Sequence, residues 1–232
     1  MRRLERSRNA GLLALLGLLG IAGTAGNAPN VEAETAAQTR WARGRELVST
    51  EFPCATFRVP AGFEYAGSHS FRIDGVSEGE RHIFVQARRH KISRLVILQF
   101  EGILPASTET YRYPLGTELW GLRWRENFFA FSNRQAVRKN PSDEAALTVS
   151  FLRSKGYRFD DEWMVWRMAA VPDPAKRHEA ILFYCESVRA SGHRLQDYVR
   201  GEESTDLWRR LSPELRQRAL SGGLEVVSGC GP

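Results

Sequence analysis

The stretch that most constrains the fold is residues 94–102, which read RLVILQFEG. Residues 95–98 are apolar at four successive positions, so both sides of an extended strand would carry apolar side chains. Such a strand is stable only where both faces of its sheet are covered. Val96 and Ile97 are β-branched, which favours a strand over a turn of buried helix. We therefore expect the central strand of a sheet here.

A second stretch, residues 180–188 (AILFYCESV), has the same character and also runs into a glutamate. Short turns between consecutive strands in the first half of the chain predict an antiparallel meander. The turn at residues 172–177 predicts a hairpin that leads into the second apolar stretch. Further strands are expected at residues 57–59, 63–74, 82–87, 119–125 and 163–171.

Helices are expected at residues 141–155 and 205–220. Asn140 and Pro141 make a typical helix start, and Gly156 ends the first helix. Pro213 interrupts the apolar face of the second region and predicts two short helices there. A short helix is also expected over residues 40–48. Together the pattern predicts an α+β fold, a mainly antiparallel sheet with helices packed largely on one face.

The first 28 residues have the pattern of a signal peptide. A basic start is followed by an apolar run at residues 11–22, which is too short to span a bilayer as a helix. The small residues that follow allow cleavage after Ala25, Ala28 or Ala33. We expect export to the periplasm or the cell exterior, with no stable transmembrane span after cleavage. Residues 29–40 then form a flexible leader and residues 41–232 a single α+β domain.

Export changes what the net charge of the chain implies about its partners. The whole chain carries 33 Lys and Arg against 27 Asp and Glu, a net charge of +6. Loss of residues 1–28 removes four arginines and one glutamate, which leaves a net charge of +3. Half of the basic excess therefore belongs to the targeting signal, and the charge gives little reason to expect nucleic acid as a partner.

Three cysteines are too few for a fold built on disulfides, and the odd count leaves one over. Cys54 and Cys230 lie near the two ends of the predicted domain, which are often close in space. An exported protein permits their oxidation. We predict a disulfide between Cys54 and Cys230, while Cys185, among apolar residues, stays buried and reduced.

The chain has none of the sequence motifs of phosphate-binding loops, nucleophile elbows, paired metal-binding cysteines or zinc proteases. Its five histidines lie far apart in sequence. The sequence therefore supplies no metal or cofactor site, and none is predicted.

Glu101 and Glu186 are the best catalytic candidates. Each follows an apolar strand, where burial would raise its pKa toward values useful in acid or base catalysis. If the two strands are neighbours, the carboxylates could share a cleft as in a glycoside hydrolase. The alternative is that each glutamate pairs with an arginine such as Arg94, Arg123 or Arg167, because structural ion pairs give the same pattern.

Aromatic residues supply the candidate ligand-binding site. Trp120 and Trp124 lie at alternate positions with Leu122 between them, which indicates one face of a strand that could line a pocket. Tyr111 and Tyr113 in the preceding loop could form its rim. The alternative is that this face belongs to the core, as aromatic side chains on one face of a strand more often do.

The preferred function is therefore an exported, non-enzymatic binding or envelope-interaction module. Its partner would be a small molecule or an envelope protein, and its pocket would use the tryptophans and tyrosines. The alternative is a periplasmic or secreted hydrolase that uses Glu101 and Glu186.

Overall fold

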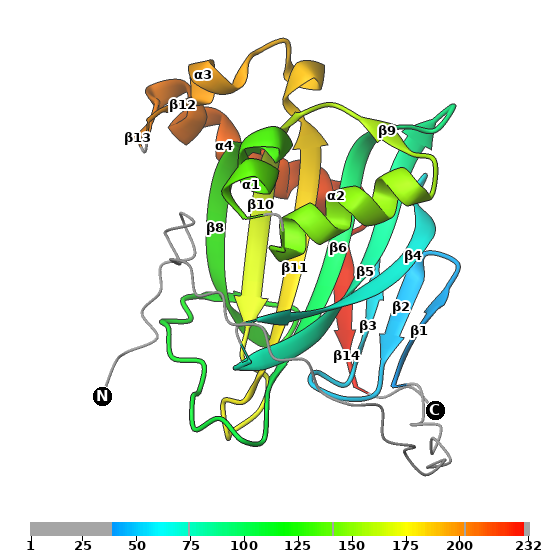
Figure 1. Ribbon diagram of the computed structural model, residues 1–232, viewed down its shortest axis with the longest axis vertical. Coiled ribbons are helices and arrows are strands. Elements are labelled where there is room, and N and C mark those ends of the chain that lie inside the picture. Colours follow the sequence, from blue (N-terminus) through cyan, green and yellow to red (C-terminus); the bar gives the residue numbers. More distant parts are fainter. Residues whose placement is uncertain (1–38, 74, 141, 202, 230–232) are drawn as a thin grey trace, which may run out of the picture.

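The computed structural model describes residues 39–73, 75–140, 142–201 and 203–229. The predicted signal peptide, all but the last two residues of the predicted leader, and Cys230 lie outside the described residues. Within these ranges the chain forms two main antiparallel sheets together with four α-helices (Figure 1). The prediction of mainly antiparallel sheet mixed with helices is confirmed at this level.

The larger sheet has the strand order β4-β5-β6-β11-β10-β8-β7, with antiparallel neighbours throughout, and the short β9 adds to β6 in parallel. The two apolar runs of the sequence form β6 and β11, which are direct neighbours in the middle of this sheet. The predicted hairpin is β10 with β11. The strands are β4 (Glu64–Ile73), β5 (Ser77–Arg88), β6 (Lys91–Ile103), β7 (Thr117–Leu119), β8 (Leu122–Ser132), β9 (Arg158–Phe159), β10 (Glu162–Ala170) and β11 (His178–Ser187).

Side chains along β6 alternate between two hydrophobic clusters, one on each face of the larger sheet. Val96 and Leu98 belong to one cluster, while Leu95 and Ile97 belong to the other. All four are buried. The prediction of a central strand covered on both faces is therefore confirmed.

A smaller sheet, in the order β1-β2-β3-β14, covers the Val96 face of the larger one. Its strands are β1 (Arg40–Arg43), β2 (Glu46–Ser49), β3 (Ala55–Arg58) and β14 (Glu225–Ser228). The short helix predicted for residues 40–48 is wrong, because this segment is the β1–β2 hairpin. Gly44 takes φ +61° in the turn, and Leu47 and Ser49 alternate inward from β2.

The helices are α1 (Asn133–Lys139), α2 (Glu144–Ser154), α3 (Leu195–Tyr198) and α4 (Asp206–Ser221). A 3-10 helix, η1 (Val188–Ser191), and a small hairpin, β12 (Val199–Arg200) with β13 (Glu203–Ser204), lie between β11 and α4.

The two longer helices lie on opposite faces of the larger sheet (Figure 1). Leu152 of α2 packs into the cluster of Leu95, whereas Trp208 and Leu215 of α4 pack into the cluster of Val96. The prediction that helices pack largely on one face is therefore wrong. The physical reason lies in the central strand itself, because apolar side chains on both faces need a cover on each side.

Residues 206–221 form one helix, so the predicted break into two short helices is also wrong. Pro213 lacks an N–H and cannot donate to the carbonyl one turn before it, which weakens the helix. The buried side chains of Trp208, Leu215 and Ala219 hold the segments on either side of the proline against the sheet. Packing of this helix against the sheet therefore outweighs the helix-start signal at Pro213.

In the described part of the chain, no helix has the length and apolar character needed to cross a membrane.

Candidate functional site

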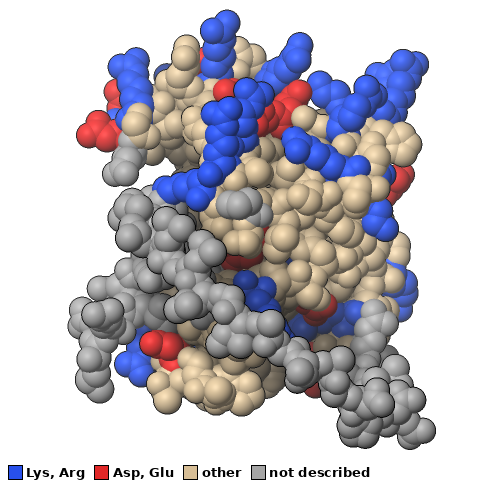
Figure 2. Space-filling model, in the orientation of Figure 1, with Lys and Arg blue, Asp and Glu red and all other residues tan. Residues whose placement is uncertain are grey.

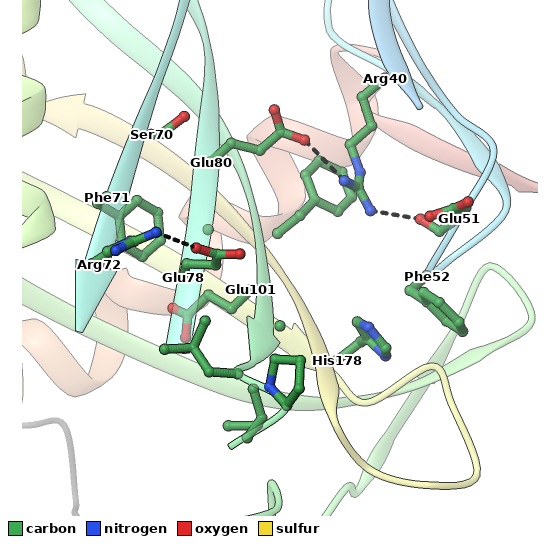
Figure 3. A pocket seen from close by; sticks show the side chains of 16 residues that line it. Arg40, Glu51, Phe52, Ser70, Phe71, Arg72, Glu78, Glu80, Glu101 and His178 are labelled. Carbon is green, nitrogen blue, oxygen red and sulfur yellow. Dashed lines mark hydrogen bonds and ion pairs between the residues drawn. The ribbon is translucent and has the colours of Figure 1, made fainter. Parts of the chain in front are cut away.

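A hollow of about 700 Å³ opens where the ends of β4, β5 and β6 meet the segment after β2 and the start of β11 (Figure 3). Its lining combines aromatic rings, arginines and carboxylates. The charged and aromatic lining residues are Arg40, Glu51, Phe52, Phe71, Arg72, Glu78, Glu80, Phe100, Glu101 and His178.

The rings of Phe52 and His178 stack at this hollow. Their centroids lie 3.8 Å apart and the planes are nearly parallel, at 6°. Phe52 is 40% exposed, which is unusual for a large apolar side chain in this protein. The stacked pair therefore offers a flat aromatic surface to solvent.

Asp173 holds His178 in place. Its Oδ2 lies 3.3 Å from His178 Nδ1, and its Oδ1 accepts the backbone N–H of His178 at 3.0 Å. Burial raises the pKa of Asp173, but hydrogen bonds from the backbone N–H groups of Arg177 and His178 outweigh it and leave the pKa below its ordinary value. Asp173 is thus an ionised anchor for the histidine ring.

Arg40 and Glu80 form a fixed ion pair in the wall of the hollow, 2.9 Å apart. The guanidinium of Arg40 also lies 4.2 Å from the centroid of the Phe100 ring and donates to the backbone oxygen of Glu51. Glu80 contacts His82 Nε2 at 3.2 Å. Burial raises the pKa of Glu80, but the hydrogen bonds from His82 and Arg40 outweigh it, so its pKa lies below the ordinary value.

The hollow as a whole is acidic. Four carboxylates line it against two arginines. One of these arginines, Arg72, pairs with Glu78 at 3.3 Å, and both side chains are more than half exposed. Exposed pairs of this kind contribute little to stability, so a bound cation could compete for Glu78.

Glu101, the first catalytic candidate, is buried at the end of β6. It accepts hydrogen bonds from Gln99 and, at 3.0 Å, from the hydroxyl of Tyr111. Gly79 makes room for it, because a Cβ there would collide with the carbonyl of Phe100 and approach the Cγ of Glu101. Glu101 is thus held within a packed network.

Directly opposite Glu101 on β11 lies Glu179, also buried. Glu179 accepts a hydrogen bond from the hydroxyl of Tyr113 at 2.6 Å and lies 3.7 Å from Arg167. Burial, together with the charge of Glu179, raises the pKa of Tyr113 above its ordinary value. The two tyrosines predicted to rim a pocket therefore bind two neighbouring carboxylates.

Glu186, the second catalytic candidate, lies near the far end of β11, where its register partner is Arg94. Glu101 comes seven positions later on β6, which separates the two carboxylates by about 23 Å at the usual rise of a strand. Glu186 accepts hydrogen bonds from Arg218 at 3.1 Å and from Tyr184 at 2.7 Å, and it pairs with Arg94 at 3.3 Å. The structure does not bring the candidate pair together, and Glu186 has the partners of a structural ion pair.

The two tryptophans have different environments. Trp124 is fully buried, and its Nε1 donates to the carbonyl of Leu119 at 2.9 Å. Trp120 lies in the turn between β7 and β8, with φ +56°, and meets Trp124 edge to face. A second hollow, of about 370 Å³, is lined by Leu119, Trp120 and Leu122 but not by Trp124. Trp124 is therefore part of the core.

The cysteines are placed as follows. Cys185 is a buried free thiol, as predicted, and burial raises its pKa to about 12. The backbone oxygen of Cys54 accepts the N–H of Gly229 at 2.9 Å. Cys230 lies outside the described residues, so the pairing of Cys54 with Cys230 stays a prediction. The hydrogen bond shows that the chain next to Cys230 runs beside Cys54.

Sequence reasoning did not single out Arg40, Phe52 or Glu80. These residues come from separate segments of the chain, and only pairing of strands brings them to one hollow. Nothing in the sequence around Phe52 indicated that its ring stacks on His178. Among the described residues, no group of His, Cys, Asp and Glu is arranged to hold a metal ion.

Comparison of the chain with protein-family models, curated proteins and solved structures gives no match. The geometry of the hollow is therefore the basis for the proposed function.

Proposed function

We propose that the protein is an exported, non-enzymatic binding module whose hollow takes a small organic cation with a flat, unsaturated group. The observation that carries the proposal is the exposed Phe52–His178 stack beside an acidic lining. A flat cationic group over an aromatic face gains both stacking and cation–π attraction. The surrounding carboxylates also favour a positively charged ligand.

The lining carboxylates differ in how available they are. Glu80 is engaged by Arg40 and His82, so it sets the shape and field of the wall. Among the described residues, Glu78 at the rim pairs with the exposed Arg72 alone. A ligand cation that displaces Arg72 would gain a charge-assisted hydrogen bond to Glu78, which is stronger than a neutral one.

The same contacts support a binder over a hydrolase. A carboxylic acid that donates a proton near neutral pH needs a raised pKa, whereas the pKa of Glu80 is lowered. The hydrolase alternative also needs Glu101 and Glu186 in one cleft, and their register separates them. We therefore do not propose a hydrolase mechanism that uses Glu101 and Glu186 as a pair.

Benzamidine, a flat aryl cation, tests this proposal against benzamide, its uncharged analogue of similar shape. Isothermal titration should detect benzamidine binding and much weaker benzamide binding. Phe52→Ala and Glu78→Gln should each weaken the binding, while Trp41→Ala, an exposed aromatic outside the lining, should leave it unchanged. Equal binding of the two compounds, or benzamidine binding that survives Phe52→Ala, would rule out this site.

Export is the second part of the proposal, and it rests on the basic start and the apolar run at residues 11–22. N-terminal sequencing of the exported protein should find a first residue between Gly26 and Glu34. A mature chain that begins at Met1 would contradict it. An envelope protein remains the alternative partner of the hollow.

A further inference from the structure

The turn between β5 and β6 has an unusual backbone for its residues. Arg89 and His90 have φ +49° and +60°, in the left-handed region that such two-residue turns normally fill with Asn and Gly. Both side chains are exposed. Residues that hold a disfavoured backbone conformation often do so for function, so the identity of these two side chains calls for an explanation.

Neighbouring segments add more positive charge to this turn. The backbone N–H of Arg158 donates to the carbonyl of His90 at 2.8 Å, and its guanidinium donates to the carbonyl of Arg89 at 3.3 Å. The last turn of α2 supplies Arg153, and the helix is followed by Lys155. We call the exposed cations Arg88, Arg89, Lys91, Arg153, Lys155 and Arg158 the basic tip.

Acidic residues do not balance the basic tip. Among the residues that the structure describes, Lys91 alone of the six forms an ion pair, with Asp160 at 3.1 Å. Exposed arginines elsewhere do find carboxylates, as Arg43 does with Glu46 and Arg209 with Asp206. Five of the six cations of the basic tip therefore have no carboxylate partner among the described residues, which leaves their charge available to an anionic partner.

Lys and Arg side chains project from the end of the molecule that carries the β5–β6 turn (Figure 2). The turn itself protrudes beyond the body of the fold (Figure 1). A protruding hairpin with a basic end can meet a flat anionic surface, whereas a polyanionic strand is usually bound in a groove.

We propose that the basic tip docks on a membrane surface that carries anionic phospholipid headgroups. Charge complementarity selects this partner over a neutral surface. The nearby rings of Tyr157 and Phe159 are half-buried against the core, so they do not offer the exposed stacking faces on which single-stranded nucleic acid binds. The large apolar side chains exposed in the described part of the chain lie outside the tip, so docking is electrostatic, peripheral and sensitive to salt.

The test uses sedimentation with two kinds of vesicle, phosphatidylcholine alone and phosphatidylcholine mixed with phosphatidylglycerol. The protein should bind the mixed vesicles at low salt, release at high salt and ignore neutral vesicles. The double variant Arg88→Gln/Arg89→Asn should bind about thirtyfold more weakly, if each charge contributes as a basic residue near an anionic membrane does. Asn suits the turn conformation, so this variant should fold at least as well as the wild type.

The matched control is Arg43→Gln/Arg209→Gln, which removes the same charge from exposed, paired sites away from the tip. It should keep most of the vesicle binding. Equal binding to both vesicle types, or an equal loss in the two double variants, would overturn the proposal. Tighter, salt-sensitive binding of an oligothymidine probe at the same residues would assign the tip to nucleic acid and would also overturn it.

Discussion

Glu101 and Glu179 face each other across the central strand pair, and each accepts a hydroxyl hydrogen bond from the loop that follows β6. Side chains directly opposite each other in an antiparallel pair have Cβ atoms about 5 Å apart. Two carboxylates at that separation repel each other unless hydrogen bonds and cations compensate. Tyr111, Tyr113 and Arg167 supply that compensation, so the loop is fastened to the sheet through its two tyrosines.

Tyr113→Phe should therefore destabilise the fold. It leaves the buried Glu179 carboxylate with one hydrogen bond fewer, at a cost of about 1–3 kcal/mol. Urea denaturation monitored by tryptophan fluorescence measures the change. Tyr157→Phe is the control, because no described hydrogen bond involves its hydroxyl, and it should change stability by less than about 0.5 kcal/mol. Equal effects would mean that the Tyr113 contact contributes nothing.

Glu186→Gln tests the interpretation of Glu186 as a structural ion-pair residue. The change removes the negative charge that Arg94 and Arg218 share. Because both arginines are partly exposed, the loss should be about 1–2 kcal/mol, below that of a fully buried pair. Glu214→Gln, which breaks an exposed pair within α4, should cost less than about 0.5 kcal/mol. A Glu186→Gln protein as stable as the wild type would contradict this interpretation.

Trp124→Ala should carry the full cost of a large core truncation, about 3–5 kcal/mol. The pocket interpretation of the sequence predicted a smaller loss than a full core truncation, but Trp124 is fully buried and lines neither hollow, which favours the full loss instead. The exposed Trp41 is the matched control, and Trp41→Ala should cost less than about 1 kcal/mol. Chemical denaturation compares the two, and a ligand that rescues Trp124→Ala by filling the space would be consistent with its core position.

Acid should weaken the Arg40–Glu80 pair in a defined direction. The pKa of Glu80 is lowered from its ordinary value of 4.5, so the folded state favours the ionised carboxylate. Its contribution to stability is present above pH 4.5 and is lost as the pH falls through the lower pKa of the folded state. The stability difference between wild type and Glu80→Gln should therefore shrink below pH 4.5. A difference that stays constant or grows on acidification would show that Glu80 is not held as an anion.

The cysteine arrangement predicts a clear pattern of reactivity. Folded protein should resist iodoacetamide at pH 8, because the Cys185 thiol is buried with a pKa of about 12. Peptide mapping without reductant should recover Cys54 joined to Cys230, since Gly229 hydrogen-bonds to Cys54. Unfolding in denaturant should expose one reactive thiol per chain. Finding Cys185 in a disulfide would refute the assignment.

Local sequence patterns predicted the strands and turns that are determined by residues adjacent in the chain. The unbroken apolar run around Val96 indicated a strand covered on both sides, and the turn before His178 indicated a hairpin, as found. The same local view failed at residues 40–48, where strand pairing with β3 outweighed a weak helical pattern. It also failed at Pro213, where packing of α4 on the sheet outweighed a local start signal.

The candidate site was harder to predict, because it depends on register. Glu101 was rightly identified as the end of a buried strand, yet its partner across the sheet is Glu179 and not Glu186. A single sequence gives no means of choosing between these glutamates, since both lie in the same strand. The stack of Phe52 on His178 joins segments more than a hundred residues apart, so no local sequence pattern indicates it.

The pairing of β3 with β14 has a consequence for how the chain reaches its native state. Arg58 and Glu225, 167 residues apart, are opposite each other in this pair, so the smaller sheet is complete only once β14 has joined strands from a distant part of the chain. Contacts this distant in sequence form slowly, because a long loop must close before they stabilise anything. The Val96 face of the larger sheet therefore stays partly uncovered until β14 has paired with β3. A chain in that state exposes apolar surface to which chaperones can bind, and the core closes when β14 pairs with β3.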